Sequence, residues 1–520
     1  MKGPFTPTPR YGIFLIGKST FAAQRGSIMT NPALPQVHLR IGDQHLTTGS
    51  GGVHQHVNPS TGQVQAEVPL AGPAEVEAAC QAAQAAFQVW RRTPPAVRRD
   101  ALLKLAELMG EARKEIAAAA ALENGVAIGL ATTQVWLTRQ WLSYYAGWAD
   151  KLEGTVSNSM IHGGDLTYTL PEPYGVIAVI TTWNVPLLSV AMKIGPALAA
   201  GNTVVIKPSE MTPFTPEIFA RLADEAGIPA GVINMVPGTA EAGAALVAHP
   251  LTQKVSFTGG PATARIIMAS CAQHLKPSVM ELGGKSANII FPDANLDVAV
   301  HEVVTGGLAN LSGQACIMGS RVLLHEDIYD EVVPRLKAGA EALAIGDPSI
   351  RGNVMGPVVN AAATQRILGL IDEAKANGDG TLLTGGTKLG GELAGGNFIA
   401  PTLFVDVDPN SSLAMNEVFG PVCAVIKFKT EEEAIAIANS TQFGLAAYIH
   451  SNDLNLVHRV SEELRAGSVY VNGAYPVVPN TPFGGLGESG FGREGGKPGI
   501  EEFIRPKSVI IAGPRPGVKK

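Results

Sequence analysis

The sequence predicts an α/β protein: a doubly wound parallel sheet, a second α/β domain and a small β element. Apolar runs too short for helices alternate with helix-length segments between Gly175 and Leu282, and the alternation resumes after Gly284. Because parallel neighbouring strands need a crossover connection, this pattern indicates parallel sheets with helices between their strands. No repeat of fixed period occurs, which excludes a solenoid or a propeller.

The N-terminal part is predicted to be mainly helical. Residues 1–35 are expected to form a disordered leader, with Met29 as a second candidate start. Apolar residues then recur at helical spacing over 75–90 and 96–122. A stretch rich in Thr, Val, Tyr and Gly over 154–170 predicts a pair of strands.

Two series of strands follow in the sequence. The first is predicted at 175–180, 203–206, 232–236, 255–257 and 279–282. The second is predicted at 321–324, 422–428, 445–449 and 468–471, with helices at 328–344 and 431–439. Pro and Gly punctuate the chain after Asn472, which predicts a long loop before a last strand at 508–511.

The composition excludes several classes of protein. The 520 residues carry 39 basic and 45 acidic side chains without a basic block, so we expect no nucleic acid partner. The longest apolar stretch, 185–200, is interrupted by Lys193, so we expect no membrane span. Four cysteines without a C-x-x-C pair favour a reducing compartment, and we predict the cytoplasm. No Cys/His cluster has ligand spacing, so no metal is predicted.

Two motif-like stretches do not predict phosphate binding. Residues 485–490 fit G-x-G-x-x-G, but the prolines before them exclude the strand that a dinucleotide motif requires. Gly284-Lys285-Ser286 resembles the end of a phosphate loop, but Val279 stands where that loop needs a glycine.

Cys316 is a candidate nucleophile. It ends the segment Ser312-Gly313-Gln314-Ala315-Cys316, which predicts a loop between a helix and a strand. A loop cysteine can be exposed and reactive, whereas a free cysteine more often packs as a small hydrophobe. The local sequence by itself favours the second interpretation.

Polar side chains also stand at the ends of predicted strands. Glu281 ends an apolar strand, where burial would raise its pKa toward the range of a general base; the alternative is a strand end that faces solvent. Asn184 offers an amide to an oxyanion, or is an ordinary turn residue. Lys207 and Glu210 offer charges to a ribose or phosphate, or form a surface ion pair.

Seven motifs in order along residues 40–510 resemble the aldehyde dehydrogenase superfamily. They are Trp183-Asn184, Lys207-Pro208-Ser209-Glu210, Phe257-Thr258-Gly259, Glu281-Leu282-Gly283-Gly284-Lys285, Gly313-Gln314-Ala315-Cys316, Glu417-Val418-Phe419-Gly420-Pro421 and Pro482-Phe483-Gly484-Gly485. The resemblance favours the catalytic interpretation of Cys316 and Glu281.

The resemblance implies oxidation of an aldehyde to its carboxylic acid. Cys316 would attack the carbonyl, and Asn184 with the Cys316 backbone N–H would hold the oxyanion of the thiohemiacetal. Transfer of hydride to the nicotinamide would leave a thioester, and Glu281 would activate the water that hydrolyses it. Lys193 matches a position that supports the active site. The implied cofactor contacts are Thr182, Trp183, Lys207, Ser209, Glu210, Gly259, Gly260, Leu282, Glu417 and Phe419.

The residues that the resemblance assigns to the site also predict the preferred cofactor and the class of substrate. Glu210 would repel the additional phosphate of NADP, so NAD is preferred and NADP is the alternative. The residues expected to line the aldehyde tunnel are Val185, Leu188, Met192, Ile317, Ala474 and Tyr475. Because most of them are apolar, we expect an uncharged aliphatic or aromatic aldehyde.

Two other activities remain as alternatives. A CoA-acylating relative would pass the thioester to CoA, but such enzymes generally lack the glutamate that Glu281 matches. A cofactor-independent cysteine hydrolase would need a histidine base, and no recognised segment contains one.

The resemblance also divides the chain. A Rossmann-like NAD-binding domain would take 36–150 and 172–283, and the catalytic domain 284–480. Residues 151–171 and 497–513 would form an oligomerisation element, which implies a homodimer or homotetramer.

Overall fold

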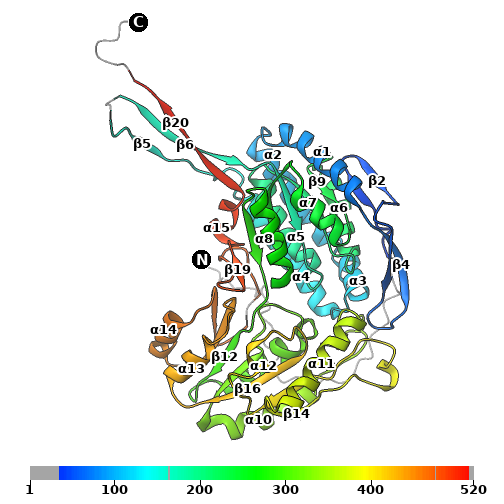
Figure 1. Ribbon diagram of the computed structural model, residues 1–520, viewed down its shortest axis with the longest axis vertical. Coiled ribbons are helices and arrows are strands. Elements are labelled where there is room, and N and C mark those ends of the chain that lie inside the picture. Colours follow the sequence, from blue (N-terminus) through cyan, green and yellow to red (C-terminus); the bar gives the residue numbers. More distant parts are fainter. Residues whose placement is uncertain (1–33, 162–163, 475, 514–520) are drawn as a thin grey trace, which may run out of the picture.

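Two large sheets and a projecting β arm organise the chain (Figure 1). The computed structural model describes residues 34–161, 164–474 and 476–513, so most of the predicted leader lies outside the described residues. The α/β fold class predicted from the sequence is confirmed.

The first sheet has eight described strands, and its central ones are parallel. Their order is β19 (Gly490–Phe491), β11 (Ser278–Glu281), β10 (Thr252–Thr258), β7 (Val176–Ile180), β8 (Thr203–Lys207), β9 (Ile233–Met235), β1 (Leu39–Ile41) and β2 (Gln44–Leu46). The chain runs from β7 outward to β8 and β9, then returns to place β10 on the other side of β7. The strand order therefore reverses between β7 and β10, where open α/β sheets bind ligands.

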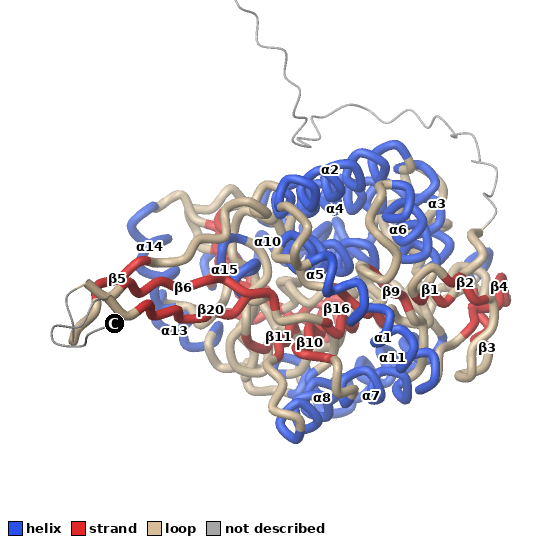
Figure 2. Tube along the Cα trace, turned by 90° about the horizontal axis from the view of Figure 1, so that it is seen from above, coloured by secondary structure: helices blue, strands red, loops and turns tan. Residues whose placement is uncertain are grey.

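Helices cover both faces of this sheet (Figure 2). The connecting helices are α5 (Pro186–Ala199), α6 (Phe214–Glu225), α7 (Ala240–Ala248) and α8 (Pro261–Gln273). The N-terminal helices are α1 (Pro73–Trp90), α2 (Pro95–Glu111), α3 (Arg113–Glu123) and α4 (Ile128–Ala146). Alternate residues of β7 face opposite cores: Ile177 packs with α2, α4, α5 and α6, and Ala178 packs with α1, α7 and α8. Burial on both faces explains why the strand is apolar throughout.

The second sheet forms the lower lobe in Figure 1. Its described strands are β14 (Thr381–Thr384), β15 (Thr402–Val405), β16 (Val422–Phe428), β13 (Arg321–His325), β12 (Ala287–Ile290), β17 (Ala446–His450) and β18 (Ser468–Val471), in that order. The helices around it are α9 (Leu296–Glu302), α10 (Glu326–Glu341), α11 (Ala361–Asn377), α12 (Ser412–Met415), α13 (Glu431–Ala438) and α14 (Leu454–Glu463). A π-helical turn, η1 (Val303–Ala309), continues α9 toward the loop of Cys316.

The projecting arm is an antiparallel sheet of β5 (Val156–Asn158), β6 (Leu166–Pro173) and β20 (Ile504–Ile511). The longest pairing in the arm is between β6 and β20, which are far apart in sequence. A separate pair, β3 (Val53–Val57) and β4 (Val64–Pro69), lies near the N-terminal strands.

The structure corrects the prediction of one long loop after Asn472. Helix α15 (Gly496–Glu501) forms there, although Gly496, Pro498 and Gly499 are poor helix formers. Its Ile500 is fully buried in the core of the first sheet, so tertiary packing outweighs the local preference. The helical stretch predicted at 96–122 is likewise two helices, α2 and α3, separated at Ala112.

Candidate active site

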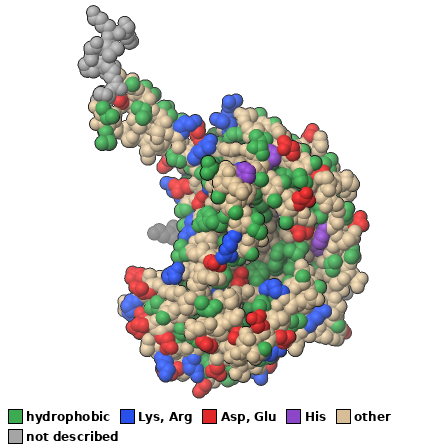
Figure 3. Space-filling model, in the orientation of Figure 1, with side chains coloured by type: hydrophobic (Ala, Val, Ile, Leu, Met, Phe, Trp, Pro, Cys, Tyr) green, Lys and Arg blue, Asp and Glu red, His purple; other side chains and the backbone are tan. Residues whose placement is uncertain are grey.

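The carboxyl edge of the first sheet faces the amino ends of strands in the second. Asn184 follows β7 and Glu281 ends β11, whereas Cys316 precedes β13 and Glu417 precedes β16. The surface is hollowed between the body and the lower lobe, and hydrophobic side chains gather there (Figure 3). The sites predicted on separate segments therefore meet between the two sheets.

Cys316 lies in a tight loop against the end of the first sheet. Leu311 and Ser312 before it have φ values of 50° and 53°, in the left-handed region that non-glycine residues rarely adopt. A Cβ at Gly284 would lie 2.5 Å from the Cys316 carbonyl oxygen, so the two segments are in direct contact. Burial, and after it the charges of Glu417 and Glu281, raise the pKa of the Cys316 thiol to about 12. The thiol is therefore protonated near neutral pH.

Asn184 contacts the loop that carries Cys316. Its Nδ2 donates a hydrogen bond of 2.8 Å to the carbonyl of Gln314, two residues before the cysteine. Because a carbonyl oxygen only accepts, this bond fixes which way the buried amide points. The amide has a second N–H, and its buried Oδ1 has no hydrogen-bond partner among the described residues.

Glu281 is a buried carboxylate without hydrogen bonds. The residue is 3% exposed, and neither carboxyl oxygen has a partner within the described part of the chain. Burial raises its pKa well above the ordinary value, and the charge of Glu494 adds to this effect. An unpartnered buried carboxylate is costly for folding, which favours a role in chemistry over a structural one.

Lys193, on α5, forms a buried ion pair beside Glu281. Its Nζ lies 2.5 Å from Glu494 Oε1 and 3.1 Å from Ser256 Oγ. The charge of Lys193 lowers the pKa of Glu281, whereas that of Glu494 raises it. Sequence reasoning missed Glu494, because a single glutamate in a Gly-rich loop carries no signal of its own.

The predicted cofactor contacts line the carboxyl edge of the first sheet. Lys207 Nζ lies 3.8 Å from Glu210 Oε2, and burial lowers the pKa of this lysine. Gly259 donates its N–H to the carbonyl of Glu281 at 3.1 Å, which joins β10 to β11 at this edge. A Cβ at Gly260, the residue before α8, would meet no atom within 4 Å. Ser209, half-buried Thr182 and buried Leu282 stand on neighbouring strand ends.

Glu417 and Phe419 reach this edge from the second sheet. Glu417 Oε1 accepts from the backbone N–H of Gly284 at 2.9 Å, and burial raises the pKa of Glu417 to about 7. The ring of Phe419 stands edge-to-face against Trp183, with centroids 5.4 Å apart. These contacts connect the loop before β16 with the segment after β11 and with the loop after β7.

The predicted substrate residues are only partly brought together. Val185, Cys316 and Ile317 are partly buried and pack against the same hydrophobic core. Leu188 and Met192 are buried on α5, and their place in a tunnel stays a prediction. Tyr475 lies outside the described residues.

A cavity of about 550 Å³ borders the nucleophile loop on the side of the second sheet. Ile317, Met318 and Gly319, which follow Cys316, form part of its wall. Ile317 and Ala474 of the predicted tunnel residues line this cavity, but most of its lining was not predicted from the sequence: Leu130, Asn288, His301, Glu302, Thr305, Gly306, Gly307, Ala309, Asn310, Val354, Tyr448 and Pro476. The hydroxyl of Tyr448 donates to the carbonyl of Ile317 at 2.7 Å, and this hydrogen bond connects the cavity wall with the loop of Cys316.

The described residues contain neither a metal-binding cluster nor a membrane-spanning helix. No group of three or more His, Cys, Asp or Glu side chains within residues 34–161, 164–474 and 476–513 could hold a metal ion. Across the same ranges, no helix combines the length and the apolar composition that a membrane crossing requires.

Comparison with known proteins decides the family. The model of the aldehyde dehydrogenase family matches residues 46–509. The chain belongs to this family. As a member, this aldehyde dehydrogenase is an oxidoreductase that oxidises a small-molecule aldehyde, and the resemblance predicted from the seven motifs is confirmed.

Relatives and solved structures agree with this assignment. The chain is 42% identical to the aldehyde dehydrogenase of Alternaria alternata, covering 91% of this chain and 95% of that protein. It is also 42% identical to the mitochondrial aldehyde dehydrogenase of Homo sapiens, covering 88% and 89%. Betaine aldehyde dehydrogenase from Staphylococcus aureus, solved in complex with NAD+, superposes with a TM-score of 0.89 at 34% identity, covering 92% and 95%.

Proposed function

We propose that the enzyme oxidises an uncharged aldehyde to the carboxylic acid with NAD, through a thioester on Cys316. The observation that carries this proposal is the convergence of Cys316, the Asn184 amide and the unpartnered carboxylate of Glu281 between the two sheets. Nucleophile, oxyanion donor and base are the three groups that acyl transfer requires.

The first step is addition of the Cys316 sulfur to the aldehyde carbon. A carbon–sulfur bond forms while the carbonyl oxygen takes the negative charge, and the free N–H of Asn184 and the Cys316 backbone N–H hold that oxygen. Because the thiol pKa is about 12, its proton has to leave for the attack to occur. The pKa of Glu281 is raised and its charge acts on the Cys316 thiol, so Glu281 is a candidate acceptor of this proton.

The residues at the crevice fit a nicotinamide dinucleotide. Lys207 and Glu210 offer a cation and a carboxylate after β8, and Glu417 offers a second carboxylate from the other sheet. The open space at Gly260 leaves the N-terminus of α8 accessible to a pyrophosphate. When bound there, NAD would supply the two-electron acceptor for oxidising the adduct on Cys316.

The last step is hydrolysis of the thioester. After the thiol proton has passed from Glu281 to solvent, Glu281 takes a proton from water and the water oxygen adds to the thioester carbon. Cleavage of the carbon–sulfur bond then releases the acid and leaves Cys316 as the thiolate. Burial raises the pKa of this base, the charge of Glu494 raises it further, and the charge of Lys193 lowers it. A CoA-acylating reaction would not need Glu281, so NADH formation that requires added CoA would favour that alternative.

We infer a preference for NAD over NADP. Glu210 lies next to Lys207 at the end of β8, where a ribose would be held, and a carboxylate repels a phosphate on that ribose. The Glu210→Gln variant should gain relative activity with NADP, measured as the ratio of kcat/KM for the two cofactors. A wild-type ratio above one for NADP would contradict the inference.

The cavity beside Ile317 supports a substrate of some size, and we propose that this substrate is uncharged. Its lining includes several small residues, Gly306, Gly307 and Ala309, on the π-helical turn. A panel of hexanal, benzaldehyde and succinate semialdehyde, compared by kcat/KM, tests the preference. Succinate semialdehyde as the best of the three would contradict it.

We further propose that the arm formed by β5, β6 and β20 joins subunits into a homodimer or homotetramer. Val156, Leu166, Leu170 and Ile510 are exposed apolar residues on this arm. Strand β18 ends the second sheet in the order of its described strands and offers an edge for pairing.

We propose three domains. The NAD-binding domain comprises 36–150 and 172–283, the catalytic domain 284–480, and the oligomerisation arm 151–171 and 497–513. We also propose the cytoplasm as location, although a relative from Homo sapiens is mitochondrial.

One experiment tests the proposed chemistry. NADH formation with NAD and each aldehyde is followed for the wild type and for Cys316→Ala. We expect activity that needs both cofactor and Cys316. Ester hydrolysis without cofactor together with no NADH formation would instead favour the cysteine hydrolase.

A further inference from the structure

Asn124 binds the two backbone carbonyls on either side of the Asn184 Cα. It follows α3, is 5% exposed, and lies outside every segment that the sequence singled out. Its Nδ2 donates to the carbonyls of Trp183 at 3.1 Å and Asn184 at 3.2 Å. Its Oδ1 accepts from the N–H of Val126 at 3.2 Å. Both ends of the Asn124 amide are therefore used, and its donor end is directed at the backbone of Asn184.

The direction of the Asn184 side chain depends on this backbone. One N–H of the Asn184 amide donates to the carbonyl of Gln314. With that bond in place, the position of the Asn184 backbone determines the direction of the other N–H. The residue has no further side-chain anchor, because its Oδ1 is without a partner in the described structure. Hydrogen-bond donors for an oxyanion act only when aimed at the place where charge develops.

A second set of contacts connects the segment of Asn124 with the loop that carries Cys316. A Cβ at Gly356 would lie 1.9 Å from the carbonyl oxygen of Gly125, the residue after Asn124. The carbonyl of Gly356 accepts from Ser312 Oγ at 2.8 Å, and Gln314 Oε1 accepts from the N–H of Val359 at 3.0 Å. The segment of Asn124 therefore contacts both the loop of Asn184 and the support of the loop that carries Cys316.

We propose that Asn124 is a positioning residue that aims the free N–H of Asn184 at the oxygen of the aldehyde attacked by Cys316. The proposal rests on the proposed function, in which Asn184 holds that oxyanion. Asn124 itself acts through the backbone and does not touch the reacting atoms.

The Asn124→Asp variant tests the donor. It keeps the size of the side chain and the oxygen that accepts from Val126, but places a second oxygen against two carbonyls. Small displacements of a catalytic group cost up to about 100-fold in rate, so we expect kcat to fall by about 10-fold to 100-fold. The KM for the aldehyde should stay within about 3-fold, since the N–H acts on the oxyanion. Asn124→Ser, which introduces no charge, serves as the second variant if the first is poorly folded.

Asn202 provides a matched control at the other end of α5. Its Nδ2 also donates to two carbonyls, those of Ala197 at 3.1 Å and Phe503 at 2.9 Å. Its Oδ1 also accepts one backbone N–H, from Gly175 at 3.0 Å. The Asn202→Asp variant should lose stability in urea unfolding while kcat per folded enzyme stays unchanged.

A double-mutant cycle decides whether Asn124 acts through Asn184. In the Asn184→Ala background, Asn124→Asp should change kcat by less than about 2-fold, because the N–H to be aimed is gone. An equal loss of kcat in both backgrounds, or a kcat unchanged by Asn124→Asp and Asn124→Ser, would overturn the positioning role. If Asn184→Ala itself leaves kcat unchanged, the oxyanion role of the proposed function fails and the inference fails with it.

Discussion

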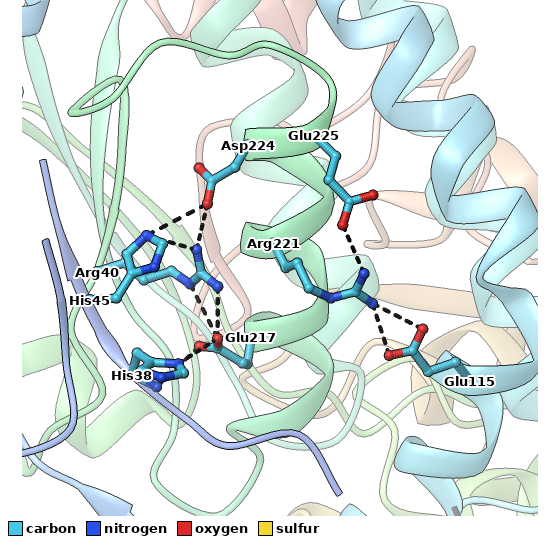
Figure 4. A network of polar contacts seen from close by, with 8 residues as sticks. All are labelled: His38, Arg40, His45, Glu115, Glu217, Arg221, Asp224 and Glu225. Carbon is cyan, nitrogen blue, oxygen red and sulfur yellow. Dashed lines mark hydrogen bonds and ion pairs between the residues drawn. The ribbon is translucent and has the colours of Figure 1, made fainter. Parts of the chain in front are cut away.

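Two buried carboxylates in the same half of the molecule have opposite surroundings. Glu217, on α6, is 4% exposed and is bonded by Arg40 Nη2 at 2.8 Å and Arg40 Nε at 3.3 Å (Figure 4). The backbone N–H of His38 lies 3.2 Å from Oε2 of Glu217, and its ring Nδ1 lies 3.0 Å from Oε1. Glu281 is equally buried and has no hydrogen bond among the described residues.

The difference separates a structural carboxylate from a reactive one. The bonds to Glu217 join β1 to α6, so this charge contributes to the fold. Glu281 has no such compensation, and its charged form is destabilised by burial. Buried polar groups without partners are rare in native proteins, and they are found where function requires them. Substitutions at the two sites should therefore affect different observables.

The largest effect is expected for Cys316→Ala on activity. Removing the nucleophile of an acyl-transfer enzyme lowers kcat by about 10⁴-fold or more. Stability should change little, since the cysteine is only partly buried and forms no disulfide. NADH formation and urea unfolding measure the two quantities. A variant that retains a tenth of the wild-type kcat would contradict the role of Cys316.

The Glu281→Gln variant should lose activity and keep its stability. A general base contributes about 10²-fold to 10⁴-fold to the rate, and an amide cannot take the proton of water. Because the change removes an unpaired buried charge, the free energy of unfolding should stay equal or rise. A burst of NADH equal to the enzyme concentration, followed by slow turnover, would place the defect in hydrolysis of the thioester. An absent burst would point to the addition step instead.

The Glu217→Gln variant should show the opposite pattern. Breaking a buried ion pair by removing one partner costs about 3–5 kcal/mol, because Arg40 is 7% exposed and would lose its main partner. Urea unfolding measures this loss. The kcat of the folded enzyme should be unchanged, and a selective loss of kcat would show that the network supports the active site.

The raised pKa of Glu281 predicts opposite pH trends for rate and stability. The base must be deprotonated, so hydrolysis should slow as the pH falls through the raised pKa. The folded state binds the proton more tightly than the unfolded state, whose Glu pKa is about 4.3. The contribution of protonated Glu281 to the stability of the folded state is therefore fully present below about pH 4.3. It is lost as the pH rises through the pKa of Glu281 in the folded protein. As the pH rises through this pKa, Glu281→Gln should gain stability relative to the wild type. In the variant, the rate of hydrolysis should no longer rise with pH. The same limb in both proteins would contradict the assignment.

The smallest effect is expected for Asp224→Asn. Asp224 lies 2.5 Å from Arg40 Nη1, but its side chain is 54% exposed. Exposed ion pairs contribute about 0–1 kcal/mol, so the free energy of unfolding should fall by no more than about 1 kcal/mol. A loss as large as that of Glu217→Gln would mean that the whole network acts as one unit.

Local patterns predicted many of the elements and the polar residues at strand ends. Strands β7, β8 and β11 were predicted close to their observed bounds, because each is apolar and enclosed by turn residues, whereas β10 was predicted at 255–257 and begins three residues earlier. Helix α15 was missed, since its sequence is unfavourable for a helix and only packing stabilises it. The ion pair of Lys193 with Glu494 was also missed, because the two residues are far apart in sequence.

The sequence by itself determined the fold class, the family and the chemical types of the candidate residues. These depend on periodicity and on short motifs, which are local properties of the chain. Only the tertiary structure decided that Glu281 has no partner while Glu217 has several, and that Asn124 holds the backbone of Asn184. Burial and hydrogen bonding arise between segments that meet only after folding, so the same residue type becomes structural in one place and reactive in another.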